Sequence, residues 1–251
     1  MVFEGVAAAD YDRFMGRYSA PLAAVFADFV APGAPVLDVG CGPGALTAML
    51  ARRLGPASVT AVDPAPAFIA AVRERLPGVD AQVASAEGLP FEDDRFAATL
   101  AQLVVHFMSD PAAGTREMVR VTRPRGVVAA CVWDLQNARA PHAVLLRAAR
   151  AETGGPPEPP RAGTSRGDLA RLLADAGCRE VSEAELTVTA EFASFDQWWA
   201  ATNIRVGVAA SALAGLDDAG VERVRARTRE HWGEGPLQVS GTAWAARGLA
   251  P

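Results

Sequence analysis

Residues 36–44 read VLDVGCGPG, a stretch that passes from an apolar run with one acid, Asp38, into glycines spaced two apart. Residues 45–54 then repeat apolar side chains at helical spacing. The pattern predicts a buried strand, a tight turn and the N-terminus of a helix. Glycine accepts a positive φ and has no Cβ, so a ligand can lie directly against the turn and the first amides of the helix.

A second β-branched run, residues 59–62, ends in Asp63, nineteen residues after Gly44. A carboxylate at the tip of the next parallel strand can accept hydrogen bonds from both hydroxyls of a ribose. The alternative is that Asp63 caps the helix that follows. Because the glycine turn precedes this acid, we favour the ribose.

Outward from these two strands, the pattern alternates between strand and helix. Further strands are predicted over 79–84, 96–105, 127–133, 178–190 and 237–248, and helices over 21–30, 46–54, 67–76, 168–176 and 217–232. This order predicts an α/β fold with a doubly wound, mostly parallel sheet. Residues 156–160, PPEPP, belong to neither a helix nor a central strand and predict a surface excursion.

The glycine turn resembles the first motif, D-x-G-x-G-x-G, of the class I S-adenosylmethionine-dependent methyltransferases. A dinucleotide site would instead read G-x-G-x-x-G, with the third glycine one residue later. The resemblance runs from about residue 3 to residue 134, and more loosely to the end of the chain. It implies a Rossmann-like methyltransferase fold with a seven-stranded sheet whose last strand is antiparallel, a helical cap inserted before that strand, and S-adenosyl-L-methionine as the cofactor.

The resemblance also implies which residues contact the cofactor. The expected set is Asp38, Gly40, Cys41, Gly42 and Gly44 in the first motif, Asp63 and Pro64 after the second strand, Ser85, Ala86 and Glu87 in the adenine segment, and Gln102 on the fourth strand. Many relatives carry an acid where this chain has Ser85, so the contact to the exocyclic amine of adenine is weaker here or is supplied otherwise.

The residues ahead of the predicted helix 21–30 have two possible roles. Tyr11, Arg17 and Tyr18 offer hydroxyls and a cation that suit the amino-acid end of the cofactor. They equally suit a cover on the edge of the sheet, and the sequence favours neither reading.

His106 is the candidate catalytic base. It follows the fourth strand, and ligands of open α/β sheets bind outside the carboxyl ends of the strands. A phenolic acceptor needs a base at neutral pH, whereas some amines need none. The alternative, which carries more weight, is a structural histidine bonded to the backbone.

Aromatic residues late in the chain are candidates for contact with the substrate. These are Trp133, Trp198 and Trp199, with Asn203 nearby. Tryptophans at helical spacing are more often core, and we expect that of one of the pair Trp198 and Trp199. Residues 1–251 are read as one domain, with 1–30 as an N-terminal helical cover and the insertions 135–165 and 191–235 as a substrate cap.

Composition narrows the functional class. The net charge of −5 offers no basic face for nucleic acid or an anionic membrane, and no apolar run approaches the length of a membrane span. The three cysteines lie far apart without metal-ligand spacing, which predicts reduced thiols, a cytoplasmic location and no metal site. The sequence names neither the acceptor nor the oligomeric state.

Three functions therefore compete. The first is transfer of a methyl group from S-adenosylmethionine to an O, N or C atom of a small molecule, by in-line displacement with possible help from His106. The second is a protein of the same fold that uses the cofactor for another reaction or for binding only. The third and weakest is an NAD(P)-dependent oxidoreductase, because a chain without lysine has no Tyr-x-x-x-Lys pair.

Overall fold

The computed structural model describes residues 15–154, 159–203 and 207–251. Its centre is a seven-stranded sheet in the order β3-β2-β1-β4-β5-β7-β6. The strands are β1 (Val36–Val39), β2 (Val59–Asp63), β3 (Asp80–Val83), β4 (Phe96–Gln102), β5 (Thr122–Trp133), β6 (Arg179–Phe192) and β7 (Leu237–Leu249). Strands β1 to β5 pair in parallel, and β7 runs antiparallel to both of its neighbours. The predicted doubly wound α/β fold with an antiparallel last strand is confirmed.

The central strands are apolar because both of their faces are covered. Every residue of β1 and β2 is buried. Val36 belongs to one cluster of buried side chains and its neighbour Leu37 to another, as expected for side chains that alternate across a sheet. Parallel sheets of this kind occur with helices on both faces.

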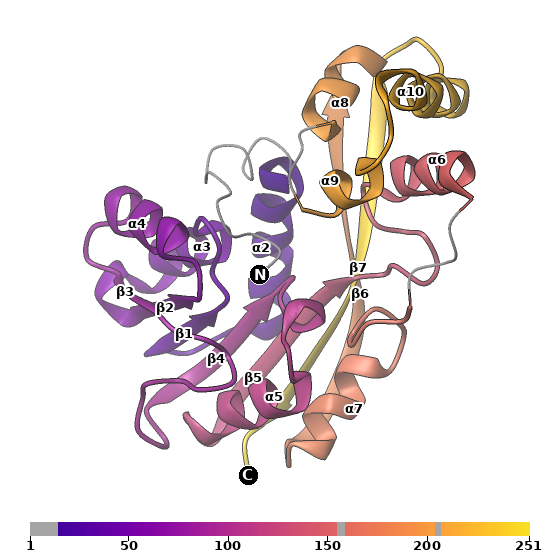
Figure 1. Ribbon diagram of the computed structural model, residues 1–251. Helices are drawn as coiled ribbons and strands as arrows, with labels where there is room; N and C mark the ends of the chain where they lie inside the picture. Colours follow the sequence, from indigo (N-terminus) through magenta and orange to yellow (C-terminus); the bar gives the residue numbers. More distant parts are fainter. Residues whose placement is uncertain (1–14, 155–158, 204–206) are drawn as a thin grey trace.

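Helices cover the two faces in separate groups. One face packs against α2 (Arg17–Val30), α3 (Ala45–Leu54) and α4 (Pro66–Arg75), and the other against α5 (Pro111–Arg120) and α7 (Asp168–Asp175) (Figure 1). Two short 3-10 turns are also present. The turn η2 (Pro56–Ser58) joins α3 to β2, and η3 (Val105–Phe107) follows the end of β4.

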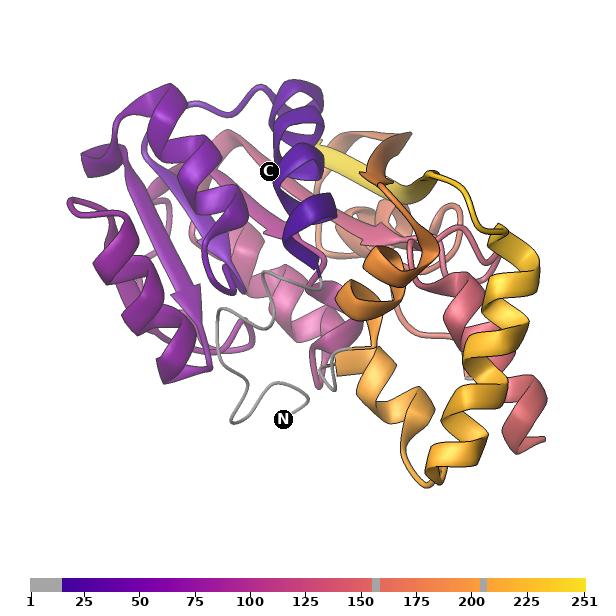
Figure 2. The same ribbon diagram turned by 90° about the horizontal axis from the view of Figure 1, so that it is seen from above.

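The last two strands are the longest and carry a helical cap. The helices α8 (Phe195–Thr202), α9 (Gly207–Leu213) and α10 (Asp218–Trp232) lie between β6 and β7 in the sequence. With α6 (Ala143–Thr153) they gather at the far end of the β6–β7 pair (Figure 1). Seen from above, they lie on the side of the molecule opposite the strands β1 to β3 (Figure 2). The predicted insertion of a helical cap before the last strand is confirmed.

The structure corrects three boundaries. The first described helix begins at Arg17, so Arg17 and Tyr18 lie inside α2 instead of ahead of it. The fourth strand ends at Gln102, not at residue 105, because the backbone of Leu103 turns to a positive φ and a 3-10 turn follows. The fifth strand begins at Thr122, five residues early, since Phe96 already pairs with it there. Among the described residues, no helix has the length and apolar character needed to cross a membrane.

Candidate functional site

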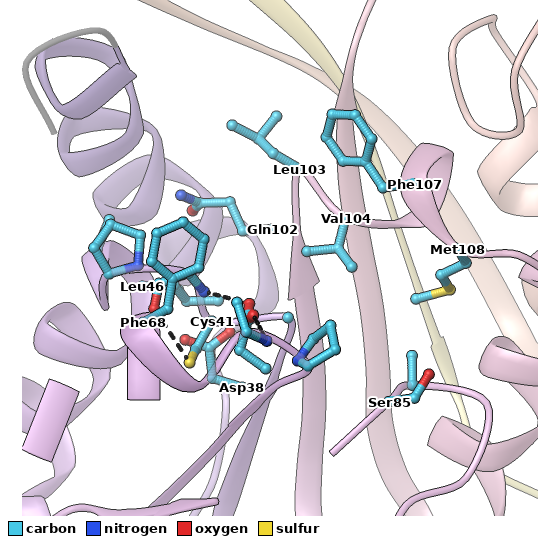
Figure 3. Close-up of a pocket in the computed structure, with 18 of the residues that line it drawn as sticks. Asp38, Cys41, Leu46, Phe68, Ser85, Gln102, Leu103, Val104, Phe107 and Met108 are labelled. Atoms are coloured by element: carbon cyan, nitrogen blue, oxygen red, sulfur yellow. Dashed lines mark hydrogen bonds between the residues drawn. The ribbon is translucent and has the colours of Figure 1, made fainter. Parts of the chain in front are cut away.

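A cavity of about 660 Å³ opens at the carboxyl ends of β1, β2 and β4 (Figure 3). Its wall combines the glycine turn, the start of α4, the loop after β3 and the tip of β4. The lining residues are Ser19, Asp38, Gly40, Cys41, Gly42, Pro43, Ala45, Leu46, Asp63, Pro64, Ala65, Pro66, Ala67, Phe68, Ser85, Ala86, Glu87, Gln102, Leu103, Val104, Phe107, Met108 and Ser109.

Two glycines of the turn serve different purposes. A Cβ on Gly40 would lie 2.5 Å from methyl groups of Val104, so packing requires this glycine. A Cβ on Gly42 would have no described atom within 4 Å. Its φ of +53° favours glycine, and the space in front of it belongs to the cavity. Gly42 is therefore where the backbone itself is open to a ligand.

Asp63 ties the glycine turn to the second strand. Its Oδ2 accepts from the amide of Gly42 at 2.9 Å, and its Oδ1 accepts from the amide of Ala65 at 2.8 Å. The N-cap of α4 is Ala65, so Asp63 is not the helix cap that the alternative reading predicted. Each carboxylate oxygen keeps a further lone pair, and the side chain lines the cavity.

Asp38 is a buried acid with one unused oxygen. The hydroxyl of Thr47 donates to its Oδ2 at 2.6 Å, whereas its Oδ1 has no partner among the described residues. Burial raises the pKa of Asp38 to about 7, the Thr47 hydrogen bond opposes this, and the nearby charge of Asp63 adds to it. Burial also raises the pKa of Asp63. The two acids thus form a region that favours a cationic ligand.

The tip of β4 presents consecutive side chains to the cavity. Gln102, Leu103 and Val104 all line it, although alternate residues of a strand point to opposite faces. The positive φ of Leu103, +61°, breaks the alternation. Gln102 Nε2 donates to the carbonyl of Ser19 at 3.0 Å, while Gln102 Oε1 and Ser19 Oγ are buried without a described partner.

The loop after β3, which contains Ser85, Ala86 and Glu87, forms another wall of the cavity. Ser85 and Met108 face Leu46 and Phe68 across the cavity (Figure 3). The Ser85 hydroxyl donates to a carboxylate oxygen of Glu87.

The cavity wall carries negative charge only. Asp38, Asp63 and Glu87 line it, and no described lining residue is an arginine or a histidine. Among the described residues there is also no group of three or more histidines, cysteines or acids that could hold a metal ion.

Several predicted site residues lie outside the set that lines the cavity. Arg17 donates to the carbonyl of Glu191 at 3.5 Å and lies over the ring of Phe192, so its guanidinium points to β6. Burial raises the pKa of Tyr18, whose hydroxyl has no described partner. Tyr11 is outside the described residues.

The predicted substrate residues lie in packed regions. Trp133 is 3% exposed, Trp198 is 0% and Trp199 is 7%. Trp198 packs against Phe195, Trp199 and Trp232 in the cap, which agrees with the core reading. Asn203 is the C-cap of α8. A substrate role for these four residues stays a prediction.

His106 is not among the residues that line the cavity, and its ring centroid lies 3.9 Å from that of its neighbour Phe107. Its Nδ1 is buried and has no described partner. Burial lowers the pKa of His106 to about 3, and Arg161 and His142 lower it further through their charges. A neutral imidazole with so low a pKa is a weak acceptor of a proton.

Sequence reasoning missed part of the site. Ser19 lies in the first turn of α2, and no motif marks it. Leu46, Phe68, Leu103, Val104, Phe107 and Met108 supply the apolar wall. Their apolar character was visible in the sequence, but it does not distinguish a cavity wall from core. The one usable signal for these residues was that some of them lie close in the sequence to Asp63 or to the end of β4.

Comparison with known proteins adds independent findings. A family model described as a methyltransferase domain matches residues 37–130. The chain is 37% identical over 137 residues to an uncharacterized methyltransferase of Mycobacterium tuberculosis, a match that covers 54% of this chain and 53% of that protein. It is 32% identical over 205 residues to a trans-aconitate 2-methyltransferase of Methylobacterium nodulans, which covers 80% of this chain and 69% of that protein.

The fold has a solved counterpart from Thermotoga maritima, described as an S-adenosylmethionine-dependent methyltransferase and possible histamine N-methyltransferase. The TM-score is 0.63 at 16% identity, over 100% of this chain and 98% of the other. This likeness concerns the fold. The chain spans about half the length of the Mycobacterium relative that it matches.

Proposed function

Because the chain belongs to the class I S-adenosylmethionine-dependent methyltransferases, we propose that it binds this cofactor in the cavity and methylates a small molecule. The observation that carries the proposal is the charge of the wall. Three carboxylates and no described basic group line a cavity at the glycine turn. Such a wall suits the cationic S-adenosylmethionine and repels the pyrophosphate of a dinucleotide.

Three hydrogen-bond acceptors of the site fit the ammonium group at the amino-acid end of the cofactor. Asp38 Oδ1, Gln102 Oε1 and Ser19 Oγ are buried acceptors without a described partner. Buried polar atoms are nearly always hydrogen-bonded, so these atoms call for a ligand or water. An ammonium group carries three N–H donors, which matches them in kind and number.

The other residues fit the nucleoside. Asp63 would accept from the ribose hydroxyls, and the open backbone at Gly42 leaves room for the ligand. The side chains of Val104 and Met108 would pack against the base. Cys41 and Pro64 also line this part of the cavity, and Gly44 begins the helix behind it.

When bound, S-adenosylmethionine supplies a methyl group already activated by its sulfonium. The chain then has to orient the acceptor in line with that group and keep water out. Leu103 and Phe107 line the end of the cavity away from the glycine turn (Figure 3). We further propose that the predicted insertions 135–165 and 191–235 select the acceptor.

The test is a pair of measurements on the purified protein. Calorimetric titration with S-adenosylmethionine, S-adenosylhomocysteine and NAD is expected to detect binding of the first two only. Transfer of labelled methyl is then assayed on small acceptors, beginning with trans-aconitate, the molecule for which one relative is named. Binding of NAD alone would overturn the proposal. Cofactor binding without transfer to any acceptor would favour another reaction on the same fold.

His106→Ala tests the candidate base. Since burial lowers the pKa of His106 to about 3, we expect the substitution to change kcat less than about tenfold. The pH profile of kcat between pH 5 and 9 should keep its shape. A loss of about a hundredfold, with unchanged KM and unchanged thermal unfolding, would instead identify His106 as the base.

A further inference from the structure

The loop after β3 contains an acid and a hydroxyl that act as a unit. Ser85 donates its hydroxyl hydrogen to Oε2 of Glu87. Both residues line the cavity, and Ala86 between them is buried. The hydrogen of the Ser85 hydroxyl is therefore directed at the carboxylate and not at a ligand.

Glu87 is itself held in place. Its Oε1 accepts from the amide of Ser109 at 2.8 Å and from the amide of Asp110 at 3.4 Å. Burial acts to raise the pKa of Glu87, but the hydrogen bonds from Ser85 and from these amides outweigh it, so the pKa lies below its ordinary value. The carboxylate is thus ionised at neutral pH and cannot rotate without losing its amide partners.

The Ser85 hydroxyl consequently acts toward the cavity as an acceptor. A hydroxyl whose hydrogen is committed offers only its lone pairs to a second partner. The neighbouring negative charge strengthens this acceptor and disfavours an oxygen brought up against it. The pair Ser85 and Glu87 therefore presents a hydrogen-bond acceptor to the cavity.

The position of the pair relative to Asp63 is fixed by the sheet. The amide of Ala84 donates to the carbonyl of Asp63 at 3.2 Å, so Ser85 follows directly beside the expected ribose site. The side chains of Val104 and Met108 line the same part of the cavity. A base attached to a ribose at Asp63 therefore has its edge within this region.

Resting on the proposed function, we propose that Glu87 is a positioning residue that keeps Ser85 an acceptor and so selects a cofactor whose base presents an amino group over one that presents a carbonyl oxygen. Glu87 acts through Ser85 and touches no reacting atom. Its contribution is selectivity for the 6-amino purine.

The experiment compares binding of two ligands by calorimetry. S-adenosylhomocysteine carries the amino group, and S-inosylhomocysteine carries a carbonyl oxygen in its place. In Glu87→Gln, the amide can donate to Ser85 and free the hydroxyl hydrogen, so the ratio of the two affinities should fall about tenfold from the wild-type ratio. Ser85→Ala removes the acceptor and should lower the ratio by a similar factor.

The controls separate selectivity from damage. Glu92→Gln removes the same charge from an exposed position on the same loop and should leave the ratio unchanged. Thermal unfolding reports whether Glu87→Gln loosens the loop. If it does, Ser85→Ala carries the test, because it leaves the bonds of Glu87 to Ser109 and Asp110 in place.

The outcomes are distinct. An unchanged ratio in Glu87→Gln or in Ser85→Ala, with the variant folded, overturns the role of the pair. A wild-type protein that binds neither ligand overturns the proposed function, and this inference with it. A ratio that falls in both variants and not in Glu92→Gln supports the proposal.

Discussion

Asp63→Ala is expected to weaken binding of S-adenosylhomocysteine by about a hundredfold or more. Under the proposed function the carboxylate would accept from both ribose hydroxyls, and hydrogen bonds to a charged group contribute about 1.5 to 3 kcal/mol each. The substitution also releases the amides of Gly42 and Ala65, which Asp63 holds at 2.9 and 2.8 Å. Calorimetric titration measures the loss directly.

Two further variants show what the loss means. Asp63→Asn keeps an oxygen that can accept from one of the two amides, whereas its NH2 group cannot accept from the other, and the charged acceptor is lost. Asp80→Ala removes an acid from an exposed position at the start of β3 and should bind like the wild type. If Asp63→Ala binds the ligand as the wild type does and unfolds at the same temperature, the assignment of the ribose site is wrong.

The second large effect is a dependence of cofactor affinity on pH. Burial raises the pKa of Asp38 to about 7. The hydrogen bond from Thr47 acts to lower this pKa, and the charge of Asp63 acts to raise it further. The ionised form is the one that attracts a cation, so the protonated form must lose its proton when the ligand binds. We expect affinity for S-adenosylhomocysteine to be about tenfold weaker at pH 6 than at pH 8, and about a hundredfold weaker at pH 5.

Asp38→Asn is the matched test of this coupling. The side-chain oxygen of asparagine can still accept from Thr47, so the fold of the site is kept. Binding should be weaker at pH 8 and nearly independent of pH. Calorimetry in buffers of different ionisation enthalpy should detect proton release in the wild type and little in the variant. A wild-type affinity that does not change between pH 5 and pH 8 would contradict the role of Asp38.

The raised pKa of Asp38 also makes the stability of the ligand-free protein depend on pH. The ordinary pKa of Asp38 is 3.8 and its folded pKa is about 7, so between these values the folded state holds the proton more tightly than the unfolded state. The stability that the protonated Asp38 contributes to the folded state is fully present below pH 3.8, and it is lost as the pH rises through about 7. Compared with the wild type, Asp38→Asn should gain stability as the pH rises, by about 4 kcal/mol at most.

The sequence predicted most of the fold because the signals were local. Alternation of strand and helix patterns, with glycine and proline at the turns, indicated the doubly wound sheet. The glycine turn indicated a ligand site because positive φ and the absence of a Cβ are properties of the residue itself. Asp63 was predicted from its place at the end of a strand, where parallel topology makes the position meaningful.

The boundaries that were wrong depended on long-range contacts. Phe96 at the start of β4 pairs with Thr122 on the neighbouring strand, so β5 begins five residues earlier than predicted. The early end of β4 follows the left-handed backbone of Leu103, whose amide still donates to the carbonyl of Cys131 at 2.7 Å. No pattern in residues 96–105 reveals that pairing.

By itself, then, the sequence determined the α/β architecture, the glycine turn and the acid at the end of the second strand, since these follow from periodicity and backbone preference along short segments. Only the tertiary structure decided which side chains share the cavity. It brought Ser19 to Gln102, gave Ser85 and Glu87 their common hydrogen bond, and buried Trp198 in the cap. Side-chain burial, hydrogen-bond partners and pKa shifts arise from residues that are distant in the chain, and local pattern carries little information about which of them meet.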